Sequence, residues 1–315
     1  MNTLIAMPPA PPLHGNFSGH ETFPFRYAWL KKGIDGIARR ADIFLHDDAM
    51  VELGVGKNMV RAIRHWCLAT RVAEERAAGA NSRARGLIPS DFGCSLFLEL
   101  GWDPYLEDDG SLWLLHWHLA TNAGRATTWY WAFNLCKEHE FTRDSLSGAL
   151  EQWVEKQLAT HKNWSRVAAS SLKSDVSCFV RTYVTGKRGP TSTPEDTLDC
   201  PLTTLGLLLE TAEGYRFNNG PKPGLAAPIF LYALLDFWES RHASQETLSL
   251  REIAHGEAGP GRVFRLDDDD VLAYLDTLAE LTNGRLEFDD SALVRQVVRR
   301  AAVTPREILD AYYTP

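Results

Sequence analysis

A helix–glycine–helix pattern near the start of the chain most limits the folds open to it. Residues 47–53 are predicted to form a short helix with an acidic cap, and Gly54 then ends that helix. A second helix is predicted from about Lys57 to Thr70, where apolar residues recur every three to four positions. Two helices joined by so short a glycine turn must pack against each other.

A predicted hairpin follows the helix pair. Residues 71–89 have the composition of two short strands around a polar turn of Gly, Asn and Ser. Ser90 or Asp91 then caps a further helix that runs through about Leu100. This order predicts a winged helix-turn-helix over about residues 47–100.

The second helix of this unit separates apolar from basic side chains. Its predicted buried stripe consists of Met59, Val60, Ile63, Trp66 and Cys67. Its predicted outer face carries Lys57, Asn58, Arg61, Arg64 and His65. Such a face suits a recognition helix, because Arg and Asn side chains bond base edges in the major groove. Further along, Arg71, Arg76, Arg83 and Arg85 are expected to hold backbone phosphates.

The basic charge of this helix is local. The chain of 315 residues has a net charge of −8, so bulk charge cannot hold it on a polyanion. Between Gly54 and Val72, however, there is no acidic residue and there are four basic ones. DNA contact is therefore the favoured interpretation, and a solvated helix face that happens to be basic is the alternative.

Composition and patterning together predict a mainly α protein with small β elements. The predicted parts are a flexible arm over residues 1–15, an N-terminal region over 16–140 that contains the winged helix-turn-helix, and a mostly helical C-terminal domain over 141–315. A second, degenerate winged element is a candidate at about 200–220. The Gly-, Pro-, Ser- and Thr-rich stretch over 185–199 is the expected connector.

Individual elements can be predicted within these parts. One helix is expected from Phe25 to Lys32, ending near Gly33. Later helices are expected at about 142–157, 166–183, 228–240, 271–281, 290–300 and 305–312, and a turn that leads into a short strand at 256–266.

The cysteines and the hydropathy pattern narrow the cellular setting. The five cysteines are scattered and form no CxxC pair, which argues for reduced thiols and against a zinc ribbon. No apolar run approaches the ~20 residues of a membrane helix, and the N-terminus lacks a signal-peptide pattern. A cytoplasmic protein without a membrane partner is expected.

Several motifs carry a family resemblance. They are GHETFPFRYAWLKKG at 19–33, ELGVGKNMVRAIRHW at 52–66, WDPYLEDDGSLWLLHW at 102–117, EDTLDCPL at 195–202 and GPGRVFRL at 259–266. Together they make the chain similar to a bacterial domain-of-unknown-function family associated with DNA phosphorothioation. The resemblance spans about residues 16–313.

This resemblance implies an antiviral restriction-modification system in which a protein nicks double-stranded DNA, so that sulfur can replace a non-bridging phosphate oxygen. It also implies three partners: a cysteine desulfurase, an ATPase and a sulfurtransferase of the phosphoadenosine-phosphosulfate-reductase type. Self-association as a homodimer is a further hypothesis.

No standard nuclease motif is present, so the catalytic groups must be sought among clusters of polar residues. His20 and Glu21 form the candidate catalytic pair, and with Arg26 nearby a general base, a metal ligand and a phosphate clamp would converge in one turn. The alternative is that Glu21 caps the next helix and His20 packs in the interior. A divalent cation, Mg²⁺ or Mn²⁺, is the candidate cofactor, although no motif shows its ligands.

Other clusters favour structural roles. The acids at 103–109 and 267–270 are typical of helix caps, and those at 195–199 of an exposed linker. On a helix, His116 and His118 point about 200° apart, so a packed pair is expected rather than a zinc site.

Three functional hypotheses remain. The first is a DNA-nicking endonuclease of a phosphorothioation system. The second is a non-catalytic DNA-recognition or scaffold subunit of the same machinery, which the missing nuclease motif favours. The third is a winged-helix transcriptional regulator, which would bind one promoter sequence tightly.

Overall fold

A computed structural model describes residues 14–76, 86–185, 200–291 and 294–314. Helices predominate, and the strands are short, which confirms the mainly α class with small β elements. Within this described part, no helix has the length and apolar character needed to cross a bilayer.

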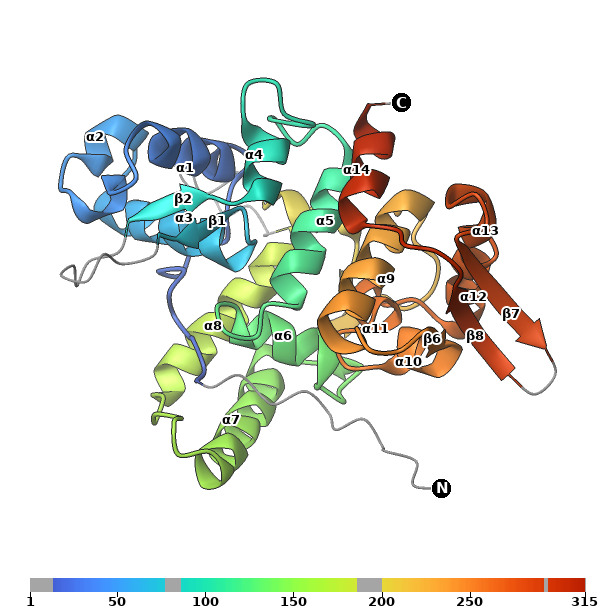
Figure 1. Cartoon of the computed structure of the whole chain (residues 1–315). Helices are drawn as coiled ribbons and strands as arrows, with labels where there is room; N and C mark the ends of the chain where they lie inside the picture. The colour runs from blue at the N-terminus through green and yellow to red at the C-terminus, as the bar shows by residue number, and fades with distance from the viewer. Residues whose placement is uncertain (1–13, 77–85, 186–199, 292–293, 315) are drawn as a thin grey trace.

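The N-terminal elements gather at one end of the molecule (Figure 1). In chain order they are α1 (Tyr27–Arg39), the 3-10 helix η1 (Ile43–Leu45), α2 (Ala49–Leu53), α3 (Lys57–Ala69), β1 (Ala73–Glu75), β2 (Leu87–Pro89) and α4 (Asp91–Phe97). Gly54 ends α2 in the left-handed conformation with φ of 64°, as a helix C-terminus favours. The Ser90 hydroxyl accepts a hydrogen bond from the Gly93 amide and so caps α4. The predicted order of helix, glycine turn, helix and antiparallel strand pair is confirmed.

The prediction that the first helix ends near Gly33 is wrong, because α1 continues to Arg39. A Cβ atom at Gly33 would lie 2.4 Å from the Cys67 sulfur of α3. The glycine therefore permits the close packing of α1 on α3. Its role is packing between helices rather than helix termination.

The central helices form the densest part of the core. They are α5 (Asp109–Ala120), α6 (Thr127–Asn134), α7 (Arg143–Thr160) and α8 (Ala169–Tyr183). All residues of α5 from Gly110 to Ala120 are buried. Figure 1 shows α5 running through the middle of the molecule, between the N-terminal elements and the C-terminal ones.

Short strands and a 3-10 helix follow in the next part of the chain. The 3-10 helix η2 (Pro201–Leu205) precedes β4 (Leu208–Glu210) and β5 (Tyr215–Phe217), and β3 (Glu140–Phe141) completes this sheet in the order β3-β5-β4. The candidate second winged element, at about 200–220, falls in this stretch, where η2 is followed by the β4–β5 strand pair. The predicted connector lies largely outside the described residues, since 186–199 are not described.

The C-terminal part combines helices with a second three-stranded sheet. The helices are α9 (Ala227–Arg241), α10 (Leu250–His255), α11 (Pro260–Phe264), α12 (Asp268–Leu275), α13 (Leu278–Leu281) and α14 (Pro305–Tyr313). The strands are β6 (Thr247–Ser249), β7 (Leu286–Ser291) and β8 (Val294–Arg299), arranged in the order β6-β8-β7.

Two predictions in this part are wrong. In place of the helix predicted over 290–300, residues 290–291 end β7 and residues 294–299 form β8, with Phe288 opposite Val297. Val297 is fully buried, and its β-branched neighbours favour the extended strand. Residues 260–264 form a helix, not a strand, since Pro260 occupies the first turn, where its missing N–H is harmless.

Candidate nucleic-acid interface

The solvent face of α3 presents the residues expected to contact DNA. Lys57, Asn58 and Arg61 are exposed, and α3 contains no acidic residue. On the opposite side, Ile63 and Trp66 are fully buried. The predicted amphipathic arrangement is confirmed, and it holds three polar side chains in one fixed array.

Two further arginines that are predicted to contact DNA, Arg64 and Arg71, have partners within the protein. The Arg64 guanidinium lies 3.4 Å from Glu75, and Arg125 lies 3.0 Å from the same carboxylate oxygen. The Arg71 side chain donates to the Thr121 carbonyl oxygen at 3.1 Å. The predicted phosphate contacts Arg83 and Arg85 lie outside the described residues.

The prediction that His65 lies on the outer face is wrong. Its side chain is only 9% exposed, because the turn of residues 18–22 covers it. A Cβ atom at Gly19 would lie 2.4 Å from the His65 Nδ1. Burial, followed by the nearby charges of His20, Arg125 and Arg64, lowers the pKa of His65 to about 3. The imidazole is therefore neutral at physiological pH.

The turn that covers α3 has an unusual backbone. Ser18, Glu21 and Thr22 have φ values of 63°, 50° and 69°. Residues other than glycine rarely adopt this left-handed backbone conformation, and a β-branched residue such as threonine is a clear outlier there. Strained backbone of this kind collects at functional sites when the surrounding structure enforces it.

His20 and Asp175 enforce that conformation. The His20 Nδ1 accepts a hydrogen bond from the Thr22 amide at 3.0 Å, so the ring proton resides on Nε2 and is donated to Asp175 at 3.0 Å. His20 and Asp175 are each only 1% exposed. Both ring nitrogens of His20 are thus occupied, Nδ1 by the Thr22 amide of the turn and Nε2 by Asp175 of α8.

Asp175 of α8 gathers more donors around the same turn. Its carboxylate accepts from the Ser18 amide at 2.6 Å and from the Thr128 hydroxyl at 2.8 Å. Arg181, one helical turn and a half further along α8, donates to the Thr22 carbonyl oxygen. Sequence reasoning missed Asp175, because no local pattern links it to a turn 155 residues away.

Glu21 lies next to the basic face of α3. Its carboxylate is 3.4 Å from the Arg61 guanidinium, and the two side chains are 32% and 57% exposed. The structure therefore brings together Glu21, predicted for catalysis, and Arg61, predicted for DNA contact. Because both remain accessible, a phosphate could reach them from solvent.

The other polar clusters have structural roles. Asp103 accepts hydrogen bonds from the Glu107 and Asp108 amides, and Asp267 forms a capping box with Asp270. His116 and His118 are buried on α5 and contact Tyr183 and Tyr232 respectively.

The described residues form no cluster of candidate metal ligands. Across the described ranges, no three or more His, Cys, Asp or Glu side chains come together so that they could share an ion. Glu21 has Arg61 as its charged neighbour rather than a second carboxylate. The second carboxylate at the turn, that of Asp175, is already occupied by the Ser18 amide, His20 and the Thr128 hydroxyl.

Comparison with known proteins places the chain in context. The model of a family described as a protein of unknown function, DUF4007, matches residues 17–313. The crystal structure of SspB is 33% identical in sequence, covers 95% of this chain and 88% of its own, and superposes with a TM-score of 0.82. The crystal structure of magnesium ion-bound SspB has the same identity and coverage and a TM-score of 0.84. A search of curated proteins finds no match.

Proposed function

The chain belongs to the DUF4007 family of proteins of unknown function, and from this premise we propose that it is the DNA-binding, DNA-nicking subunit of a phosphorothioation system. The likeness to SspB over 95% of the chain supports membership of such a system. A nick in one strand would expose the phosphate at which sulfur is inserted. The proposed partners are double-stranded DNA, a cysteine desulfurase, an ATPase and a sulfurtransferase.

The solvent face of α3 carries the proposal. Lys57, Asn58 and Arg61 project from one rigid helix whose other face is anchored in the core. In an acidic protein, a local cluster of this kind is needed to attract phosphate groups. We propose that α2, α3 and the β1–β2 pair act as a winged helix-turn-helix, with α3 in the major groove.

Glu21 is the proposed general base. In hydrolysis of a phosphodiester, water attacks phosphorus, the bond from phosphorus to one ester oxygen breaks, and the departing oxygen takes a proton from solvent. Glu21 would accept the proton of the attacking water, and Arg61 would stabilise charge on the phosphate. His20 would act as a positioning residue through its bonds to Thr22 and Asp175.

One observation favours a second candidate, a DNA-recognition or scaffold subunit without catalytic activity. Both ring nitrogens of His20 are engaged in holding the turn, and so His20 has no free nitrogen for proton transfer. The turn would then shape a binding surface, and partner subunits would perform the chemistry.

Incubation of the purified protein with supercoiled plasmid and Mg²⁺ or Mn²⁺ separates the candidates. We expect open-circle product with the wild type, loss of product and of binding with Lys57→Gln/Arg61→Gln, and loss of product alone with Glu21→Gln. The control is Arg39→Gln, which removes an exposed charge at the far end of α1. Plasmid that is bound but stays supercoiled would support the scaffold subunit. Tight binding to one promoter sequence alone would instead indicate a transcriptional regulator.

A further inference from the structure

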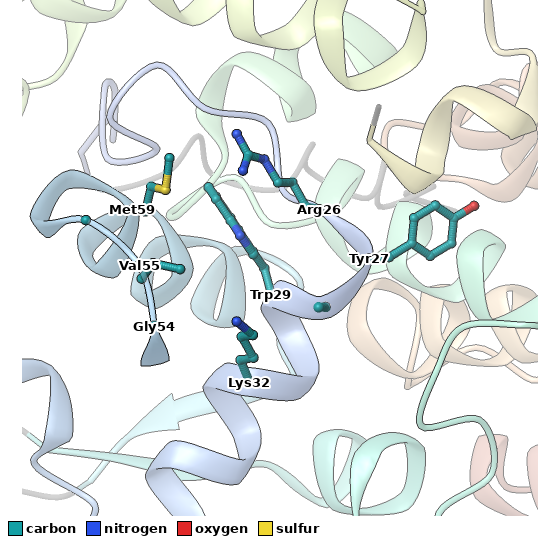
Figure 2. Close-up of a pocket in the computed structure, with 9 residues that line it drawn as sticks. Arg26, Tyr27, Trp29, Lys32, Gly54, Val55 and Met59 are labelled. Atoms are coloured by element: carbon teal, nitrogen blue, oxygen red, sulfur yellow. The ribbon is translucent and has the colours of Figure 1, made fainter. Parts of the chain in front are cut away.

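A pocket of about 720 Å³ lies between the N-terminal end of α1 and the turn that joins α2 to α3. Figure 2 shows Arg26, Trp29 and Lys32 on the α1 side and Val55 and Met59 on the other, whereas Tyr27 points away. The pocket reaches the start of α3, since Gly56 and Met59 line it and the exposed Lys57 and Asn58 lie between these two residues in the chain.

The charged groups of this pocket are all positive. Arg26 and Lys32 line it, and no carboxylate does. The Arg26 guanidinium rests 5.3 Å from the centre of the Trp29 ring, and it has no ion pair within the described part of the chain. The Lys32 ammonium donates to the Leu53 carbonyl oxygen at 3.1 Å, which holds it at the pocket wall. An anion entering the pocket would therefore meet two cations and no opposing charge.

Two helices of 13 residues begin at the same pocket. The Arg26 side chain, at the cap of α1, makes no hydrogen bond to the first amides of that helix. Gly56, at the cap of α3, has no side chain that could do so. The partial positive charge of both helix N-termini adds to that of the cations. Nothing lies within 4 Å of the position that a Cβ atom of Gly56 would occupy, so a ligand has open access to the first amides of α3.

The remainder of the wall is apolar. Trp29, Val55 and Met59 provide it, and the volume of about 720 Å³ falls among pockets that hold small organic molecules rather than single ions. The occupant should therefore combine an anionic group with a larger, less polar part. A nucleotide has this composition, with a phosphate joined to a sugar and a base.

We propose that this pocket holds one nucleotide of the bound DNA strand, turned out of the base stack. Its phosphate would lie between Arg26, Lys32 and the first amides of α3, and its sugar and base against Trp29, Val55 and Met59. This inference rests on the proposed DNA-binding function, because α3 would bring the strand to the pocket mouth. Turning a base out costs stacking and pairing free energy, which contacts in the pocket would offset.

The first test measures binding of the four deoxynucleoside 5′-monophosphates by titration calorimetry. Gly56→Asp places a carboxylate where the phosphate would bind the α3 amides, and Gly56→Asn is its uncharged match. Both residues are good helix caps, so neither variant should lose thermal stability. We expect Gly56→Asp to weaken nucleotide binding by about tenfold or more, as the loss of hydrogen bonds to a charged group predicts, and Gly56→Asn to weaken it much less. Equal effects of the two variants would overturn the proposal.

The second test uses DNA. A set of duplexes carries 2-aminopurine, each at a different position, and its fluorescence rises when the base leaves the stack. We expect this rise at one position with the wild type and with Arg39→Gln, but not with Gly56→Asp. For Arg26→Gln, the slope of log binding constant against log salt concentration should be less steep by about 1, which corresponds to one lost phosphate contact. Wild-type DNA binding without brightening, and with an unchanged slope in Arg26→Gln, would overturn the pocket assignment alone. Absence of wild-type DNA binding would overturn both this proposal and the DNA-binding function, and nucleotide binding in that case would mark a site for free nucleotides.

Discussion

Helices α3 and α5 have 13 and 12 residues, yet they place their polar groups in opposite ways. In α3, Lys57, Asn58 and Arg61 face solvent, and the apolar side packs on α1. In α5, all residues from Gly110 to Ala120 are buried.

Two buried polar side chains of α5 show how such groups find partners inside the protein. His116 contacts the Tyr183 hydroxyl and the Val263 carbonyl oxygen, each at 2.8 Å, and the Trp117 indole donates to Asp236 at 2.8 Å. The exposed cations of α3, by contrast, are available to ligands. The comparison assigns a structural role to α5, whereas the exposed face of α3 is the proposed recognition surface, so substitutions in each should affect different measurements.

The largest expected effect is that of Trp117→Ala in α5. The side chain is 1% exposed, so its removal leaves a cavity and an unpaired Asp236 carboxylate. We expect the free energy of unfolding to fall by about 3–5 kcal/mol, measured by urea denaturation. Trp117→Phe should lose less, because most of the ring volume remains. A loss below that of an ordinary surface substitution would contradict the structural role of α5.

Acidification should be the next largest effect, because α3 buries His65 and α5 buries His116 and His118, and burial lowers the pKa of all three. Burial lowers the pKa of His65 in α3 and of His116 in α5 to about 3 from the ordinary 6.5. Between these two pKa values the unfolded chain binds more protons than the folded one. The contribution of the neutral histidines to the unfolding free energy is therefore fully present above about pH 6.5 and is lost as the pH falls towards 3. We expect each histidine to contribute about 2 kcal/mol of loss between pH 7 and pH 5.

Urea denaturation at the two pH values checks this prediction. His116→Phe should show a smaller difference between pH 7 and pH 5 than the wild type, since one of the titrating groups is absent. Equal stability of the wild type at both values would show that the buried histidines are not neutral in the folded state.

A smaller loss is expected for Asp175→Asn, which loosens the turn over α3. The amide would turn a donor towards groups that now donate to the carboxylate, among them the Ser18 amide and His20. We expect a decrease of about 1–3 kcal/mol in unfolding free energy together with weaker plasmid nicking. The matched control is Asp144→Asn on α7, whose carboxylate is 94% exposed. If both variants behaved alike, Asp175 would not hold the turn.

The smallest effect on stability is expected at the face of α3 itself. Lys57→Gln/Arg61→Gln should change the unfolding free energy by no more than about 0.5 kcal/mol, as is usual for surface positions. In the same variant, the slope of log DNA-binding constant against log salt concentration should become less steep by about 2, which corresponds to two lost phosphate contacts. A large loss of stability would show that this face supports the fold and would remove the contrast with α5.

Local patterns predicted much of the N-terminal region. Gly54 and Ser90 act where a helix terminus requires them, and α3 spans nearly its predicted range. Predictions failed where a distant partner decided the outcome. Gly33 permits helix packing instead of ending α1, and residues 294–299 form strand β8, which pairs with β6 on one side and β7 on the other.

The candidate site divides in the same way. The amino-acid sequence by itself determined the amphipathic character of α3 and hence the exposure of Lys57 and Arg61, because helix periodicity is a local property. Only the tertiary structure decided that His65 is buried, that Asp175 holds the 18–22 turn and that Glu21 meets Arg61. These contacts join residues far apart in the chain, and their geometry depends on how whole helices pack.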